Sequence, residues 1–326
     1  MEARGRSLVA TCLGLGLVAV LTACQVAPGG GGSSANSGAA PAASATPDTN
    51  LTVADWKPVQ DALGKTGSLL PGGVYRVGMP RTDLKVSLDG VALQPGFALG
   101  SYAAFVRRGQ HAMAVGDLVL LETEVAGVTT KLLQSGIEVT AVHNHLLGES
   151  PHVLYLHYLA QGDAVRIAQN LRAALAETGT PLAPAGTTPV PASPQLPGID
   201  GASLDQILGR KGTVSGTVYQ VAVGRAEQVT LDGMVLPAGT GVATALNFEA
   251  TGDGHGAITG DFAMIPSEVE GVLGALRSSG IEVTALHSHM LMDSPHLLYA
   301  HFFAHGDLPM LARGLRAALV ETNSSR

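Results

Sequence analysis

Histidines recur at a fixed spacing in two stretches of the chain. Nine of the 11 histidines fall in the stretches that begin at Gly136 and Gly280. Both stretches contain the pattern His-x-His-x3-acid-x7-His. Imidazole and carboxylate groups together bind divalent transition metals, and this donor set suits Zn²⁺, Mn²⁺, Fe²⁺, Ni²⁺ or Cu²⁺ alike. The spacing therefore predicts one or two metal sites. The predicted ligands are His143, His145, Glu149 and His157 in the first stretch, and His287, His289, Asp293 and His301 in the second.

Each histidine stretch is expected to fold as a β-hairpin. In the first stretch, strands are predicted around Glu138–Leu147 and His152–Ala160, with a turn near Gly148. Residues two apart in a strand share a face of the sheet, so His143 and His145 would point the same way. Their imidazoles could then converge on one ion, with a third ligand from the neighbouring strand.

The third ligand depends on the register of the hairpin. In one register His145 lies opposite His152, and His157 points to the other side of the sheet. In the other register His143 lies opposite Tyr155, and His157 joins the cluster. A shift of one residue exchanges the two faces, so the two arrangements exclude each other. We favour the second, in which the acid at the hairpin tip closes the ligand set.

Several functions fit this histidine pattern. The leading hypothesis is a binding protein for a divalent metal or a small ligand. A metal-dependent hydrolase or lyase is the competing hypothesis, with Glu149 or Asp293 as the base beside an open coordination position. A purely structural duplication is a further alternative, in which the histidines sit in the domain interface and hydrogen-bond to the backbone. A metal-free cluster that responds to pH through its imidazoles is the last.

The two histidine stretches belong to a tandem duplication. GIEVTAVHNHLLGESPHVLYLHYLAQGD begins at Gly136 and returns as GIEVTALHSHMLMDSPHLLYAHFFAHGD at Gly280, an offset of 280 − 136 = 144 residues. LRAALAET from Leu171 returns as LRAALVET from Leu315 at the same offset. Such a long internal match indicates two copies of one domain. We place the first copy at residues 51–178 and the second at 199–322.

The order of elements within one copy predicts an α+β fold. VYRV, VSLDGVAL, FALGSYAAFV and HAMAVGDLVL are β-rich segments separated by turn residues. Thr123 is a candidate N-cap for a following helix that Gly136 ends, and Asp163 begins a last helix after the hairpin. We therefore expect a mainly antiparallel sheet with helices packed on one face, built twice.

The N-terminal residues have the pattern of an export signal. Arg4 and Arg6 precede an apolar stretch, which ends in Leu21-Thr22-Ala23-Cys24. Small residues before a cysteine are typical of bacterial lipoproteins, so residues 1–23 are predicted to be a signal peptide. Cys24 would then carry lipid such as palmitate and anchor the protein to a membrane of the bacterial envelope. Residues 24–50 and 179–198 are predicted to be a flexible tether and a proline-rich linker.

The composition narrows the possible partners. The net charge is −7, and no run of Lys and Arg is present, which argues against nucleic acid as a partner. The two cysteines, Cys12 and Cys24, both precede the duplicated region, so a metal site there must use histidines and carboxylates. A small-molecule ligand fits this composition.

The chain resembles a known family of bacterial lipoproteins. The first histidine stretch, together with FALGSYAAF and GDLVLLETEV, is similar to the LppY/LpqO family, whose domain has no known function. The resemblance covers both copies. It implies an envelope location and no established reaction, and its histidine core falls on His143, His145 and His157. The second copy departs from the family pattern at Ser288.

Overall fold

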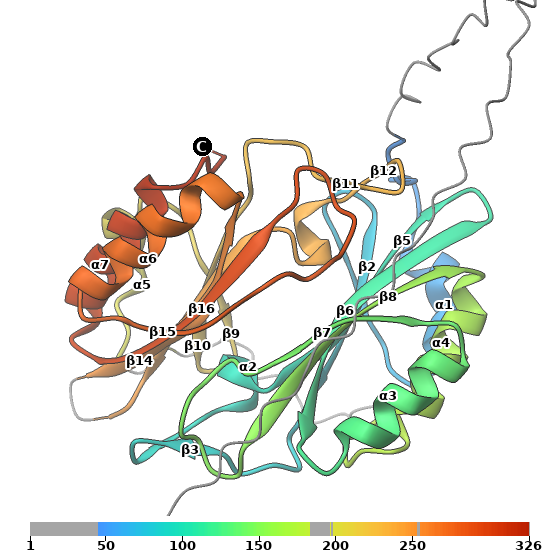
Figure 1. The fold of residues 1–326 in the computed structure, drawn as a ribbon, viewed down its shortest axis with the longest axis horizontal. Coiled ribbons are helices and arrows are strands. Elements are labelled where there is room, and N and C mark those ends of the chain that lie inside the picture. The colour runs from blue at the N-terminus through green and yellow to red at the C-terminus, as the bar shows by residue number, and fades with distance from the viewer. Residues whose placement is uncertain (1–44, 183–195, 197, 253–254, 326) are drawn as a thin grey trace, which may run out of the picture. The chain divides into compact units, whose positions relative to one another are not determined.

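A computed structural model describes residues 45–182, 196, 198–252 and 255–325. Two six-stranded antiparallel sheets, each with its own helices, make up this part of the chain (Figure 1). The predicted α+β fold in two tandem copies is therefore confirmed. Cys24 and most of the linker predicted at 179–198 lie outside the described residues. None of the described helices has the length and apolar character that crossing a membrane requires.

The first repeat begins with a short helical segment and ends with a long helix. Its helical elements are η1 (Val53–Trp56), α1 (Lys57–Leu63), α2 (Pro95–Ala98), α3 (Val125–Gln134) and α4 (Ala164–Leu175). Its strands are β1 (Ser68–Leu70), β2 (Val74–Pro80), β3 (Ser87–Leu88), β4 (Val91–Ala92), β5 (Gly100–Arg108), β6 (His111–Leu121), β7 (Glu138–His143) and β8 (Val153–Gly162).

The second repeat follows nearly the same order. Its helical elements are α5 (Gly201–Leu208), η2 (Ala238–Thr240), η3 (Pro266–Glu268), α6 (Val269–Ser278) and α7 (Leu308–Val320). Its strands are β9 (Thr213–Ser215), β10 (Val218–Val223), β11 (Thr230–Leu231), β12 (Met234–Val235), β13 (Thr244–Ala250), β14 (Gly256–Met264), β15 (Glu282–His287) and β16 (Leu298–Gly306).

The two large sheets have the same topology. The strand order is β1-β2-β5-β6-β8-β7 in the first and β9-β10-β13-β14-β16-β15 in the second. β6 and β14 lie in the middle of their sheets, and the hairpin strands β7 and β15 lie at the edges. The duplication therefore places corresponding residues at corresponding positions of two similar sheets.

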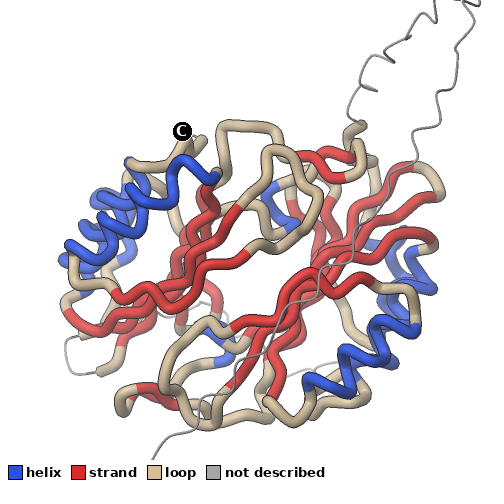
Figure 2. The backbone as a smooth tube through the Cα atoms, viewed as in Figure 1, coloured by secondary structure: helices blue, strands red, loops and turns tan. Residues whose placement is uncertain are grey.

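Helices cover one face of each sheet, and the opposite face packs against the other repeat. Figure 2 shows the helices on the outer sides and the two sets of strands between them. Each repeat has its own core between helices and sheet. Two further apolar clusters contain residues of both repeats; for example, Val115 and Leu159 pack in one cluster with Val229 and Tyr299. β6 is consequently buried on both faces, which explains its nearly continuous apolar sequence.

The predicted helix boundaries hold with one correction. Gly136 follows α3 with a φ of 73°, a left-handed conformation that favours glycine, and Gly280 has the same φ after α6. Asp163 caps α4, because its carboxylate accepts a hydrogen bond from the backbone N–H of Arg166. Thr123, however, is not the cap of α3. The N-cap is Glu124, one residue further along the chain.

The hairpin has the favoured register but a shorter first strand. His143 pairs with Tyr155, so the prediction that His157 joins the cluster is confirmed. β7 ends at His143 rather than Leu147, so His145 lies beyond the strand. The argument that His143 and His145 share a strand face is therefore wrong. The conformation of the following loop, rather than strand pleat, positions His145.

Candidate metal centre

The histidines of the two repeats meet in one centre. The ring centroids of His143 and His287 are 3.7 Å apart. His145 and His301 are also 3.7 Å apart, and His157 and His289 are 3.9 Å apart. Each of these short contacts joins one repeat to the other. The structure therefore combines the two predicted ligand sets. The six histidines of the centre are His143, His145, His157, His287, His289 and His301.

Reciprocal hydrogen bonds hold the two hairpins together at this centre. The hydroxyl of Thr140 donates to the backbone carbonyl of His289 over 2.6 Å. The hydroxyl of the corresponding Thr284 donates to the backbone carbonyl of His145 over 2.5 Å. Each threonine thus fixes the loop that carries a histidine of the other repeat. This exchange explains why the loop histidines enter a shared site.

Two aspartates that the sequence analysis missed complete the centre. Asp117 lies on β6 opposite His157, and Asp261 lies on β14 opposite His301. Asp117 Oδ2 is 3.3 Å from Nε2 of His145, and Asp261 Oδ2 is 3.0 Å from Nε2 of His289. A sequence signal was available, because Gly-Asp recurs in GDLVL and GDFAM at the offset 261 − 117 = 144 of the duplication.

Backbone hydrogen bonds orient the strand histidines. Nδ1 of His157 is 3.2 Å from the carbonyl oxygen of Gly116, and Nδ1 of His301 is 2.9 Å from that of Gly260. A carbonyl oxygen only accepts, so Nδ1 must carry the proton. Nε2 then presents a lone pair. Both Nε2 atoms are buried without a hydrogen-bond partner, which is the arrangement of a metal-ligating histidine held by an outer partner.

The contact between His289 and Asp261 fits a shared proton or a bound cation. Nδ1 of His289 donates to the carbonyl oxygen of Gly241 over 2.9 Å, so its Nε2 lone pair faces the Asp261 carboxylate. Two acceptors at that distance repel each other unless a proton or a cation lies between them. Metal–nitrogen and metal–oxygen bonds of about 2.0–2.2 Å place two adjacent ligand atoms about 3 Å apart.

Burial favours the neutral form of several imidazoles of the centre, whereas neighbouring histidines favour the ionised form of its carboxylates. Desolvation lowers the pKa of His143 and of His145 to about 3, and that of His157 to about 4. Burial alone would raise the pKa of Asp117, but the nearby His157 and His145 outweigh it and hold that pKa below its ordinary value. The pKa of Asp261 is lowered in the same way by its neighbouring histidines. The buried centre therefore carries two negative charges.

Three overlapping groups of side chains could hold a metal ion. In each, the candidate ligand atoms lie within 4.8 Å of one another. Tetrahedral coordination with bonds of about 2.0–2.1 Å needs nitrogen atoms about 3.4 Å apart, so binding would draw the ligands inward by about 1 Å at most. The donor atoms suit a divalent transition metal. The groups are His143, His157 and His287; His143, His145 and His301; and Asp261, His287 and His289.

The predicted acidic ligands lie elsewhere in the hairpins. Oε1 of Glu149 is 2.8 Å from Nδ1 of His152 and accepts from the backbone N–H of Val153 over 3.2 Å. Asp293 has the same two contacts in the second repeat, with His296 and Leu297. The structure brings neither acid into the three groups. Both carboxylates instead stabilise the loop that leads into the second hairpin strand.

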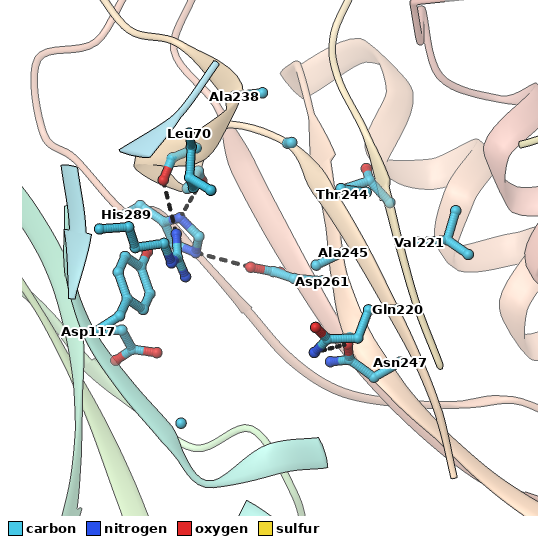
Figure 3. A pocket seen from close by; sticks show the side chains of 18 of the residues that line it. Leu70, Asp117, Gln220, Val221, Ala238, Thr244, Ala245, Asn247, Asp261 and His289 are labelled. Carbon is cyan, nitrogen blue, oxygen red and sulfur yellow. Dashed lines mark hydrogen bonds and ion pairs between the residues drawn. The ribbon is translucent and has the colours of Figure 1, made fainter. Parts of the chain in front are cut away.

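A cavity of about 800 Å³ opens onto the centre. Figure 3 shows Asp117, Asp261 and His289 at its wall, with Gln220 and Asn247 further along the second sheet. Arg76 also lines the cavity and is its only Lys or Arg among the described lining residues. The centre is therefore buried among protein side chains but reachable by a small molecule.

Comparison with known proteins identifies the family. The Domain of Unknown Function (DUF1259) family matches residues 57–177 and 202–321. A search of curated proteins finds no match. Among solved structures, EtuB from Clostridium kluyveri is 11% identical, with 78% of this chain and 89% of that chain covered and a TM-score of 0.19. The trimeric bacterial microcompartment shell protein PduB is 14% identical, with 79% and 91% covered and a TM-score of 0.20.

TM-scores this low support no statement about this chain, so only the family match carries weight. Its two matched regions span more than half of the sequence and coincide with the two sheets and their helices. The chain belongs to the Domain of Unknown Function (DUF1259) family and contains two tandem copies of that domain.

Proposed function

We propose that this protein binds a divalent transition metal ion in one centre that its two repeats build together. The observation that carries the proposal is the convergence of buried imidazole nitrogens without hydrogen-bond partners, among them Nε2 of His143, His157 and His301. Buried polar atoms are nearly always satisfied in folded proteins, so unpartnered ones that point toward each other indicate a missing ligand. A metal ion satisfies several of them at once.

The net charge of the centre supports the binding of one divalent ion per chain. Neutral imidazoles and the two ionised carboxylates of Asp117 and Asp261 leave the centre with a charge of about −2, which is costly in a buried site. One divalent cation neutralises this charge. His143 and His287 each belong to two of the three ligand groups, and every group that contains His143 also contains a histidine of the second repeat, which is consistent with a single ion that draws on both repeats.

Metal content of the full chain in detergent tests the proposal. Elemental analysis should find about one Zn, Mn, Fe, Ni or Cu per chain. His143→Ala combined with His145→Ala should reduce this content at least tenfold. His152→Ala with His296→Ala is the matched control, because these histidines are half-exposed and belong to none of the three groups. Substoichiometric metal in the unmutated protein, or equal content in all three proteins, would disprove the proposal.

We further propose that the protein is an envelope lipoprotein. The segment Leu21-Thr22-Ala23-Cys24 after an apolar stretch supports this location, as does the resemblance to the LppY/LpqO lipoproteins. Mass spectrometry of the purified protein should find lipid on Cys24. Cys24→Ala should move the protein from the membrane fraction to the soluble fraction. An unmodified Cys24 in membrane-bound protein would contradict the proposal.

The cavity supports a metal-dependent hydrolase or lyase activity as a second candidate function. It reaches Asp117 and Asp261, the carboxylates positioned to accept a proton from a substrate or a water molecule. A divalent ion bound there would supply Lewis-acid chemistry. A panel of ester, lactone and phosphoester probes tests this candidate. Turnover by the unmutated chain that disappears in His301→Ala would support it, and no turnover by metal-loaded protein would leave metal binding as the function.

A further inference from the structure

We infer that the cavity beside the metal centre binds a small organic monocarboxylate whose tail carries a polar group. The carboxylate would lie between Arg76 and the His/Asp centre, and the polar tail would lie at Gln220 and Asn247. This inference rests on the proposed metal centre and adds to it a class of ligand. Four features of the cavity support it: a fixed cation, a pair of amides, the net charge and the size.

Arg76 is held in place at one end of the cavity. Its guanidinium carbon lies 3.5 Å from the centre of the Tyr102 ring, and one of its nitrogens donates to the carbonyl oxygen of Gly239 over 2.8 Å. These two contacts fix the plane of the guanidinium and use one of its five N–H groups, which leaves donors for a ligand. A planar guanidinium fork matches the two oxygens of a carboxylate.

Arg76 also lies close to the metal centre. A Cβ atom built on Gly241 would lie 2.5 Å from the Tyr102 hydroxyl and 3.7 Å from Nδ1 of His289. The Tyr102 hydroxyl and the His289 ring are therefore neighbours across this glycine, and Arg76 stacks on the same tyrosine. A carboxylate bound by Arg76 would consequently be within a few ångströms of the centre.

Neutral amides stand at the equivalent position of the second repeat. Gln220 corresponds to Arg76 at the offset 220 − 76 = 144, and its amide nitrogen donates to the Asn247 side-chain oxygen over 3.1 Å. Figure 3 shows this pair on the wall away from His289. Amides both donate and accept hydrogen bonds, so they suit a hydroxyl or amide on the ligand rather than a second charge.

Net charge favours a monoanion. The Asp117 and Asp261 carboxylates contribute two negative charges, one divalent ion would contribute two positive charges, and Arg76 adds one more. A site with a remaining charge of about +1 is balanced by one ionised carboxylate. A phosphate monoester, with about two negative charges at neutral pH, would leave an excess.

The size and the walls of the cavity suit a small organic molecule. Its volume of about 800 Å³ lies within the range of roughly 300–1,000 Å³ that is usual for small-molecule sites. Leu70 and Phe97 contribute apolar side chains to the cavity lining. A carbon chain that links a carboxylate to a polar tail would contact these residues.

Titration calorimetry of the metal-loaded full chain in detergent tests the inference. The probes are 4-hydroxybutyrate and 6-hydroxyhexanoate, with 1,4-butanediol and 1,6-hexanediol as neutral counterparts of similar length. At least one hydroxy acid should bind, whereas its diol should not. Arg76→Gln introduces the residue that the second repeat already has at this position, and it should weaken binding at least about tenfold while metal content stays unchanged. Gln220→Leu should weaken binding a few-fold.

The outcomes separate this inference from the metal proposal. If the unmutated chain contains no metal, the proposed centre itself is wrong. If metal is present but neither hydroxy acid binds, or Arg76→Gln binds the acid as tightly as the unmutated chain, the carboxylate site is wrong. Inorganic phosphate that binds more tightly than both acids would also overturn the assignment.

Discussion

The two repeats share the residues of the proposed metal centre but differ along the cavity. Every histidine and aspartate of the centre has its counterpart at an offset of 144 residues. In contrast, strand register aligns Arg76 with Gln220 and Tyr102 with Ala245, and all four residues line the cavity. A centre at the junction of two similar repeats needs equivalent ligands from both sides. The asymmetric ligand proposed above would need different walls on its two sides, and this difference between the repeats would supply them.

A buried arginine is also shared by the repeats, away from the centre. Arg81 and Arg225 are almost fully buried, and each contacts two carboxylates and a backbone carbonyl. Their partners are Asp83, Glu124 and the carbonyl of Val119 in the first repeat, and Glu227, Glu268 and the carbonyl of Ala263 in the second. These contacts join the end of a strand to the start of a helix, so they stabilise the common fold.

The largest effect is expected on metal content, and it tests whether the two repeats share one ion. His157→Ala removes a histidine of the first repeat, and His301→Ala removes its counterpart in the second. With one shared ion, each single variant should lose most of the metal, at least tenfold in elemental analysis. Two independent sites would instead leave half of the metal in each variant. Far-UV circular dichroism should remain unchanged, which separates ligand loss from unfolding.

The second largest effect is expected on the free energy of unfolding when either buried arginine is replaced. Arg81→Met and Arg225→Met each leave two carboxylates without their cation, which costs about 3–5 kcal/mol when a buried pair is broken. We expect similar losses in the free energy of unfolding, measured by urea titration, because the two networks have the same contacts. A loss below about 1 kcal/mol at either site would show that the networks are not equivalent. Arg166→Met, at an exposed position of α4, is the control.

A smaller, pH-dependent effect comes from a difference between the repeats. Glu249 is buried where the first repeat has Val106, and desolvation raises its pKa to about 7. A raised pKa means that the folded state prefers the protonated acid. The contribution of Glu249 to stability should therefore be greatest below about pH 4.5 and be lost as the pH rises through 7, by on the order of 2–3 kcal/mol.

Glu249→Val gives the second repeat the residue of the first and should remove this dependence. Urea titrations from pH 5 to 8 on both proteins would measure it. If the difference in unfolding free energy between them stays constant across this range, the Glu249 carboxyl does not titrate as its burial requires.

The smallest effect tests the reciprocal threonine contacts. Thr140→Val and Thr284→Val each remove one hydroxyl that donates to a loop carbonyl of the other repeat. Each should lower the unfolding free energy by about 1 kcal/mol, and the two losses should add if the contacts act independently. Metal affinity should weaken in both variants, because each loop carries a histidine of the centre. An effect of only one of the two variants would show that the loops are held unequally.

The sequence by itself determined the duplication, the α+β fold and the histidines. The offset of 144 residues is visible without coordinates, whereas the sequence left two hairpin registers open and the structure decided for the favoured one, which places His157 beside His143. These features are local, because strand pleat and helix caps depend on residues close together in the chain. The same locality misled the prediction for Glu149, which lies at the hairpin tip but binds its own loop.

Only the tertiary structure decided that two sets of histidines form one centre. Asp117 and His145 are close because the β6 strand and the hairpin loop meet in space, and His145 contacts His301 because the sheets pack face against face. The spacing of residues along the chain does not reveal which surfaces of the two repeats pack against each other. The two repeats pack together through apolar faces that contain residues of both, and this packing creates the proposed metal centre and its cavity.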